Sequence, residues 1–143
     1  MTEEKRGLGL DIELSNLHDN DPRNFQLDQL GAWFGYTPKN QEVLIPVGAV
    51  NNQKQVSSCV TQAVSKQKEV YEGMPMSAGF LGAQLVRKGL MNSGGTSIQQ
   101  ALKVTCDVGI AEESLARTNN EGSFEDFSSP LMLTPQAIQN AGT

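Results

Sequence analysis

The chain has 143 residues, of which 38% are hydrophobic and 19% are charged, which is typical of one globular domain. Its net charge of −5 argues against a nucleic-acid-binding face, because phosphate binding needs clustered lysine and arginine. No apolar run approaches the ~18 residues of a membrane-spanning helix, and residues 1–6 are too polar for a secretory signal. The two cysteines are too few for a disulfide framework, which favours a reducing compartment or a particle assembled in one.

Residues 1–20 have the pattern of an N-terminal arm. Leu8, Leu10, Ile12 and Leu14 alternate with glycine and acidic residues, which predicts a short strand or an extended arm. An arm that pairs with a neighbouring chain and a loose terminal tail both fit this pattern. His18, the single histidine of the chain, lies in this arm, and we expect it at the surface.

Residues 21–47 are predicted to form connecting segments and part of the core. Residues 21–27 predict a turn into an extended segment, and residues 28–36 predict a short helix capped by Asp28. Residues 43–47 form a short apolar run that predicts a strand, although Pro46 makes a central strand position unfavourable.

A polar loop with Gln53 leads into an amphipathic run that begins at Cys59. Ser57 and Ser58 stand where a helix N-cap belongs, so we expect a helix from Cys59 to about Glu72. In the first helical turn, free amide N–H groups and the positive end of the dipole favour a lowered thiol pKa and hence a nucleophilic thiolate. The expected buried face consists of Val60, Ala63, Val64, Val70 and Tyr71.

Two further helices follow. Residues 77–88 predict a helix that ends at Gly89. Ser97 and Gln100 have capping-box spacing, so we expect a third helix from Ser97 to about Val108, with Gly109 after its end. The expected apolar face of this third helix consists of Ile98, Ala101, Leu102 and Val108.

Residues 116–143 are mostly polar. Phe124 and Phe127 stand as isolated apolar positions in this segment. Thr134 and Pro135 suit the N-cap and first position of one short final helix.

Four separated motifs follow one another along the chain: Asp21-x-Arg23-Asn24-Phe25, Gln53-x5-Cys59, Gly94-Gly95 before Ala101-Leu102 and Gly109-Ile110, and Glu112-Glu113-Ser114-Leu115. Together they resemble bacterial and phage members of the papain-like cysteine protease family. The resemblance implies that Cys59 is the nucleophile and Gln53 the oxyanion-hole donor, and that Gly94 and Gly95 line the backbone of a bound peptide. It implies an α+β fold, mainly α in this chain: the helical half of a papain-like fold with extended termini.

The sequence departs from the family in two respects. Val56 and Ser57 replace the first cysteine and glycine of the papain signature, and Val60 replaces its aromatic residue. Loss of the first cysteine removes a disulfide of secreted papains and does not change the chemistry. More seriously, none of the residues after Cys59 is a histidine, and His18 does not correspond to the family's general base. We therefore expect no peptidase activity from these 143 residues alone.

The division that follows is an arm at 1–20, a papain-like helical half-domain at 21–115 and a polar segment at 116–143. Three interpretations remain open: the chain is part of a longer enzyme, its other half is a separate chain, or it is a structural piece of a large assembly such as a phage tail or baseplate. The expected location is the cytoplasm or a virion. A histidine and an asparagine encoded beyond Thr143 would favour the enzyme. We expect a protein partner, or the family's missing half, to cover the apolar face of the Cys59 helix. Without that cover, Val60 and Val64 would face water. We expect no metal or cofactor, since Cys59 and Cys106 without nearby histidines are a poor zinc set.

Overall fold

The computed structural model describes residues 9–11, 13–14 and 48–142. The expectations for His18, for the turn at 21–27, for the helix at 28–36 and for the apolar run at 43–47 lie outside the described residues.

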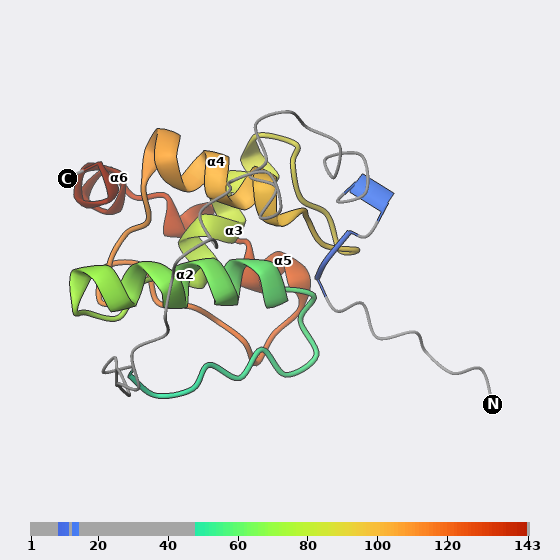
Figure 1. Cartoon of the computed structure of the whole chain (residues 1–143), viewed down its shortest axis with the longest axis horizontal. Helices are drawn as coiled ribbons and strands as arrows, with labels where there is room; N and C mark the ends of the chain where they lie inside the picture. Colours follow the sequence, from blue (N-terminus) through green and yellow to red (C-terminus); the bar gives the residue numbers. More distant parts are fainter. Residues whose placement is uncertain (1–8, 12, 15–47, 143) are drawn as a thin grey trace, which may run out of the picture.

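The described part of the chain is mainly helical, as the sequence predicts (Figure 1). Within it, β structure is limited to isolated bridges, and no helix is long and apolar enough to cross a membrane. The helices are α2 (Cys59–Glu72), α3 (Ala78–Arg87), α4 (Ile98–Val108), α5 (Phe124–Phe127), the 3-10 helix η2 (Pro130–Met132) and α6 (Pro135–Ala141).

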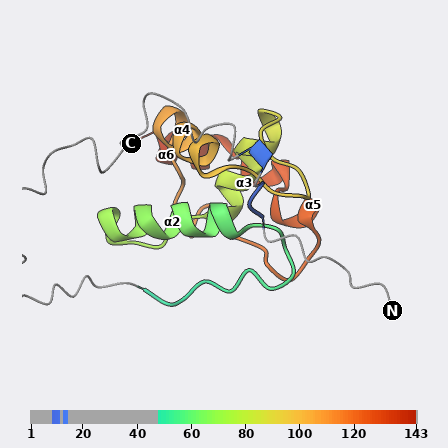
Figure 2. The same cartoon turned by 45° about the vertical axis from the view of Figure 1, so that its right-hand side comes forward.

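Helix α3 is the centre of the fold, with every residue from Ala78 to Leu85 buried. Figures 1 and 2 show α2, α4 and α5 around it. Glycine inside a helix costs about 1 kcal/mol relative to alanine, but here it permits close packing. A Cβ on Gly82 would lie 2.6 Å from Cε1 of Phe127, and a Cβ on Gly79 would lie 2.7 Å from Sδ of Met132. The two glycines therefore let the C-terminal segment rest directly on the helix.

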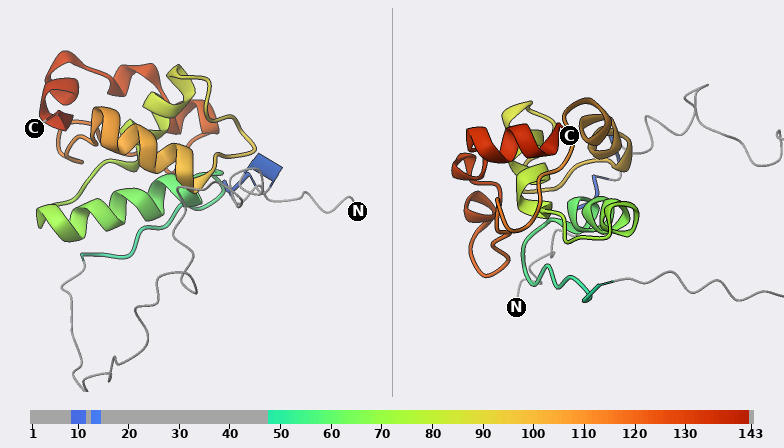
Figure 3. Two further views of the ribbon diagram at one scale, coloured as in Figure 1. Left: turned by 45° about the horizontal axis from the view of Figure 1, so that its top comes forward. Right: turned by 90° about the vertical axis from the view of Figure 1, so that its left-hand side faces the viewer.

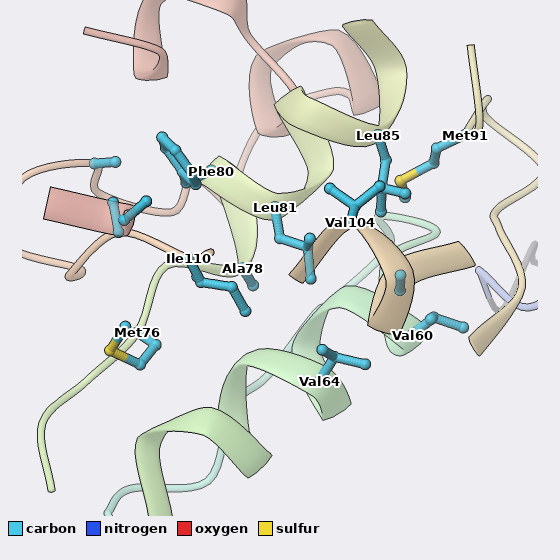
Figure 4. Packing of buried hydrophobic residues seen from close by; sticks show 14 of the residues in the cluster. Val60, Val64, Met76, Ala78, Phe80, Leu81, Leu85, Met91, Val104 and Ile110 are labelled. Atoms are coloured by element: carbon cyan, nitrogen blue, oxygen red, sulfur yellow. The ribbon is translucent and has the colours of Figure 1, made fainter. Parts of the chain in front are cut away.

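The core is formed where α2, α3 and α4 meet (Figure 4). Val60 and Val64 of α2 are only 4% and 5% exposed and belong to the same cluster as Leu81 and Val104. The expectation that Val60 and Val64 face water in this chain alone is therefore wrong, because α3 and α4 already cover that side of α2.

The predicted helix bounds agree with the structure, but the predicted apolar faces are too wide. On α2, Ala63 is exposed and Tyr71 is 81% exposed. On α4, Ala101 is buried, whereas Ile98 and Leu102 are 53% and 40% exposed. A helix contacts its neighbours along a narrow stripe, so apolar residues at the edges of a predicted face remain accessible.

The C-terminal segment packs against the core. We expected one short helix in an otherwise extended segment, and α6 begins as predicted, with the Thr134 hydroxyl accepting the N–H of Ala137. Two elements were not predicted, α5 and η2. Phe127 of α5 is fully buried against α3, so residues 124–141 complete the hydrophobic core.

Candidate active site

Cys59 is the first residue of α2, the longest helix in the described part of the chain, as the sequence predicts. Two consecutive turns lead to it: Val56 donates its N–H to the carbonyl of Gln53 at 3.1 Å, and Ser58 donates to the carbonyl of Val56 at 2.8 Å. Val56 is buried and anchors these turns. Ser58 occupies the N-cap position, but its hydroxyl makes no capping bond to the helix amides.

The thiol of Cys59 is half-buried, and burial raises its pKa because the thiolate would lose hydration. Hydrogen bonds from the backbone amides of Val60 and of Cys59 itself act in the opposite direction, as expected at a helix start. The loss of hydration is the larger effect, so the pKa lies above its ordinary value. The predicted lowering is therefore wrong for the chain in this arrangement.

The glycine pair lies in a tight turn after α3. Asn92 and Gly95 exchange backbone hydrogen bonds of 3.3 and 2.9 Å, and Gly94 donates its N–H to Oδ1 of Asn92 at 2.8 Å. Gly94 is exposed, whereas Gly95 is buried with a φ of +114°. The N–H and carbonyl of Gly95 are thus engaged inside the turn.

The backbone that pairs with an extended segment belongs to the next residue, Thr96. Its N–H donates to the carbonyl of Gly9 at 3.0 Å, and its carbonyl accepts the N–H of Asp11 at 3.0 Å. The N-terminal arm thus forms a single parallel bridge between Leu10 and Thr96 of its own chain. Glu13 and Leu14 are helical, so the strand or extended arm predicted as far as Leu14 is wrong at that end. Sequence reasoning missed Thr96, although its position directly after the glycine pair is a usable signal.

The same segment also contacts the start of α2. Gly9 is buried against the backbone of Ser57, Ser58 and Cys59. The structure thereby places the cysteine turn and the Gly95 turn on two sides of one extended segment, and Figure 3 shows this segment (blue) beside the start of α2 (green). Gly9 thereby links the start of α2 to the turn that precedes α4.

A buried glutamine fixes the loop that leads to Cys59. Gln62 accepts a hydrogen bond from Nδ2 of Asn51 at 3.0 Å and donates one to Oδ1 of Asn120 at 2.9 Å. Its Nε2 also lies 3.4 Å from the Ser58 hydroxyl oxygen. Gln62 thus connects the loop, the start of α2 and Asn120. The sequence pattern did not predict this role, because Gln62 resembles the other polar residues of the helix.

Part of the expected chemistry is not assembled in the described residues. They contain no histidine, and no group of three or more His, Cys, Asp or Glu among them is placed to hold a metal ion. Gln53 is half-buried and its carbonyl closes the first turn, so its role as an oxyanion donor stays a prediction. The roles of Cys59, Gly94 and Gly95 also stay predictions.

Comparison with known proteins supports the fold. No protein-family model matches the chain, and no curated protein matches it significantly. Among solved structures, the described architecture matches the helical part of a papain-like cysteine protease. That structure is xylellain, a cysteine protease from Xylella fastidiosa, with 18% identity and a TM-score of 0.53 over 74% of this chain and 48% of that one. This chain thus spans about half the length of xylellain, and at this identity the likeness shows the fold alone.

Proposed function

We propose that this chain is the peptide-binding helical half of a papain-like thiol peptidase related to bacterial and phage members, and that it does not hydrolyse peptides by itself. The observation that carries the proposal is the extended segment held between the start of the Cys59 helix and the Gly94–Thr96 turn. In this proposal Cys59 attacks the carbonyl carbon of a bound peptide or isopeptide, and Gln53 stabilises the oxyanion.

The proposed lack of peptide hydrolysis follows from the requirement for proton transfer. Attack by a thiol requires a base to take its proton, and the amine that leaves requires an acid; such catalysis contributes about 10²–10⁴-fold. The described residues contain no histidine, and the pKa of the half-buried Cys59 thiol is raised, so little thiolate forms at neutral pH. A second half, on the same polypeptide or on another, would have to supply the base.

Affinity labelling tests the peptide-binding cysteine. The purified chain is treated with chloroacetamide and with a peptide that carries the same electrophile, and the labelled sites are quantified by mass spectrometry. We expect the peptide to accelerate labelling of Cys59 about tenfold relative to exposed Cys106, which serves as the internal control, because binding raises the local concentration of the electrophile. Equal acceleration at the two thiols would refute a peptide-binding cysteine site.

A turnover assay tests the second part of the proposal. We expect no cleavage of a fluorogenic peptide library by the 143-residue chain. Turnover that is lost in a Cys59→Ala variant would show that the chain contains its own catalytic base and would contradict the proposed inactivity.

The alternative is a structural or interaction subunit of a large assembly, such as a phage virion. The observation that favours it is an exposed apolar strip on α2 and α4, formed by Tyr71, Ile98 and Leu102. A groove of ≈ 380 Å³ lies between these helices and is lined by Val64, Tyr71 and Leu102 among others. A protein partner on this strip would cover the outer side of α2, which the core leaves open.

Light scattering distinguishes the two roles. A chain whose role is assembly should associate through the strip, and Leu102→Lys should return it to the monomer, because a buried charge opposes association. Gln139→Lys, at an exposed position on α6 that does not line the groove, is the control. A monomer at all concentrations would contradict self-assembly.

A further inference from the structure

The side-chain amide of Gln62 connects three segments of the chain. Gln62 is only 7% exposed, and both the oxygen and the nitrogen of its amide form hydrogen bonds. Its Oε1 accepts from Nδ2 of Asn51 at 3.0 Å, and its Nε2 donates to Oδ1 of Asn120 at 2.9 Å and to the Ser58 hydroxyl at 3.4 Å. A buried amide that loses a partner also lacks the water that would replace it, so each contact restricts where the partner segments lie.

Asn120 follows a segment that is fixed to the centre of the fold. Gly79, in the first turn of α3, donates its N–H to the Thr118 hydroxyl at 3.1 Å. The N–H and the hydroxyl of Thr118 both donate to the Glu113 carboxylate, each at 2.7 Å. Asn120 therefore lies two residues after a point that the central helix holds in place.

On its other side, the Gln62 network holds the loop that leads to the cysteine. Asn51 comes two residues before Gln53, and Ser58 comes directly before Cys59. The two loop residues that contact the buried amide thus enclose the residues that the proposed function assigns to thiol attack and oxyanion binding. A change in this network should therefore be felt at both of those residues.

An ion pair joins the same two segments at the surface. Lys54 of the loop pairs with Glu121, and their side chains are 43% and 76% exposed. Exposed ion pairs contribute little, because water and salt screen the two charges. The buried amide contacts are therefore the stronger connection between the loop and residues 118–121.

We infer that Asn120 is a positioning residue for Cys59 and Gln53, and that it acts through the amide of Gln62. Its role is indirect, because it fixes the loop that contains the thiol and the oxyanion donor. Residues 118–121, which the sequence division placed outside the papain-like half-domain, thereby belong to the site. The inference rests on the proposed function for the peptide chemistry of the loop, whereas the positioning is measured without a peptide.

Alkylation by free chloroacetamide at a series of pH values tests this inference. The full chain is compared with Asn120→Ala, and modification of Cys59 and of Cys106 is quantified by mass spectrometry. Because burial raises the pKa of the Cys59 thiol, a loosened loop should hydrate the thiol and return its pKa toward the ordinary value. We expect Cys59 to react at least about threefold faster at neutral pH in the variant, with its profile moved to lower pH and Cys106 unchanged.

Two control variants separate positioning from a general loss of stability. Asn119→Ala removes the same kind of side chain from the adjacent, exposed position. Leu133→Ala removes a half-buried side chain that packs against the core, so it lowers stability without altering the Gln62 contacts. Neither control should move the pH profile of Cys59. A cavity of ≈ 160 Å³ beside Gln62 leaves room for water to replace the amide of Asn120, so Asn120→Ala should fold.

A double-mutant cycle tests the path through Gln62. In a Gln62→Leu chain, Asn120→Ala should change the Cys59 rate less than about twofold, because the partner amide is already absent. Amide hydrogen exchange at Val56, whose N–H donates to the Gln53 carbonyl, is the second measurement. It should be faster in Asn120→Ala than in the unaltered chain.

Each result supports or overturns the inference. An unchanged Cys59 profile in Asn120→Ala, or an equal change in either control, would overturn it, and additive effects of the Asn120 and Gln62 substitutions would overturn the path through the amide. If Gln62→Leu does not fold, exchange at Val56 decides, and unchanged exchange there would exclude an effect on the loop. Because the reagent carries no peptide, a shifted Cys59 profile would stand even if affinity labelling by a peptide failed.

Discussion

Phe127→Ala tests whether the C-terminal segment is part of the folding unit. The Phe127 ring is fully buried and lies directly against the backbone of α3 at Gly82. Removing a buried phenyl group costs about 3–5 kcal/mol, through lost burial and the cavity that remains. A domain of this size has a total stability of about 5–15 kcal/mol, so the variant should lose a large fraction of its free energy of unfolding.

Urea unfolding followed by circular dichroism measures the effect. Leu131→Ala is the matched control: it removes an apolar side chain from the same segment that is 86% exposed, and it should cost less than about 0.5 kcal/mol. A Phe127→Ala variant within that range would show that residues 124–141 do not support the fold, and would refute the packing described for α3.

Three further outcomes are expected. Cys106 should be alkylated faster by free chloroacetamide than Cys59, because burial raises the pKa of the Cys59 thiol, and equal labelling rates would refute this difference. Because the folded state favours the protonated Cys59 thiol, the free energy of unfolding should also fall as pH rises beyond the ordinary pKa of 9.0. Gln62→Ala should lower the free energy of unfolding by about 1–3 kcal/mol by unpairing its buried partners, whereas exposed Gln67→Ala should cost much less, as urea unfolding would show. The pKa of Asp126 should lie below its ordinary value in an NMR titration, because hydrogen bonds from the N-cap serine of α5 favour its carboxylate; a value at or above 3.8 would contradict that capping box.

The local signals in the sequence were sufficient for the helices of the core. Capping serines fixed the starts of α3 and α4, where Ser77 and Ser97 accept the N–H of the third helical residue, and Gly73 ended α2 in a left-handed conformation. These signals act within one helical turn, so they are readable without knowledge of the rest of the chain. The motif spacing likewise placed Cys59 at a helix start.

Burial and chemistry depended on contacts between distant residues. Periodicity marked Val64 and Tyr71 alike, yet only Val64 faces α3 and α4. The pKa of Cys59 is set by burial as well as by its helix, and the neighbouring Gly9 comes from fifty residues earlier in the sequence. The sequence by itself therefore determined where the helices begin and end, because caps and turns are local; only the tertiary structure decided which faces are buried and what lies over the cysteine, because those depend on which segments pack together.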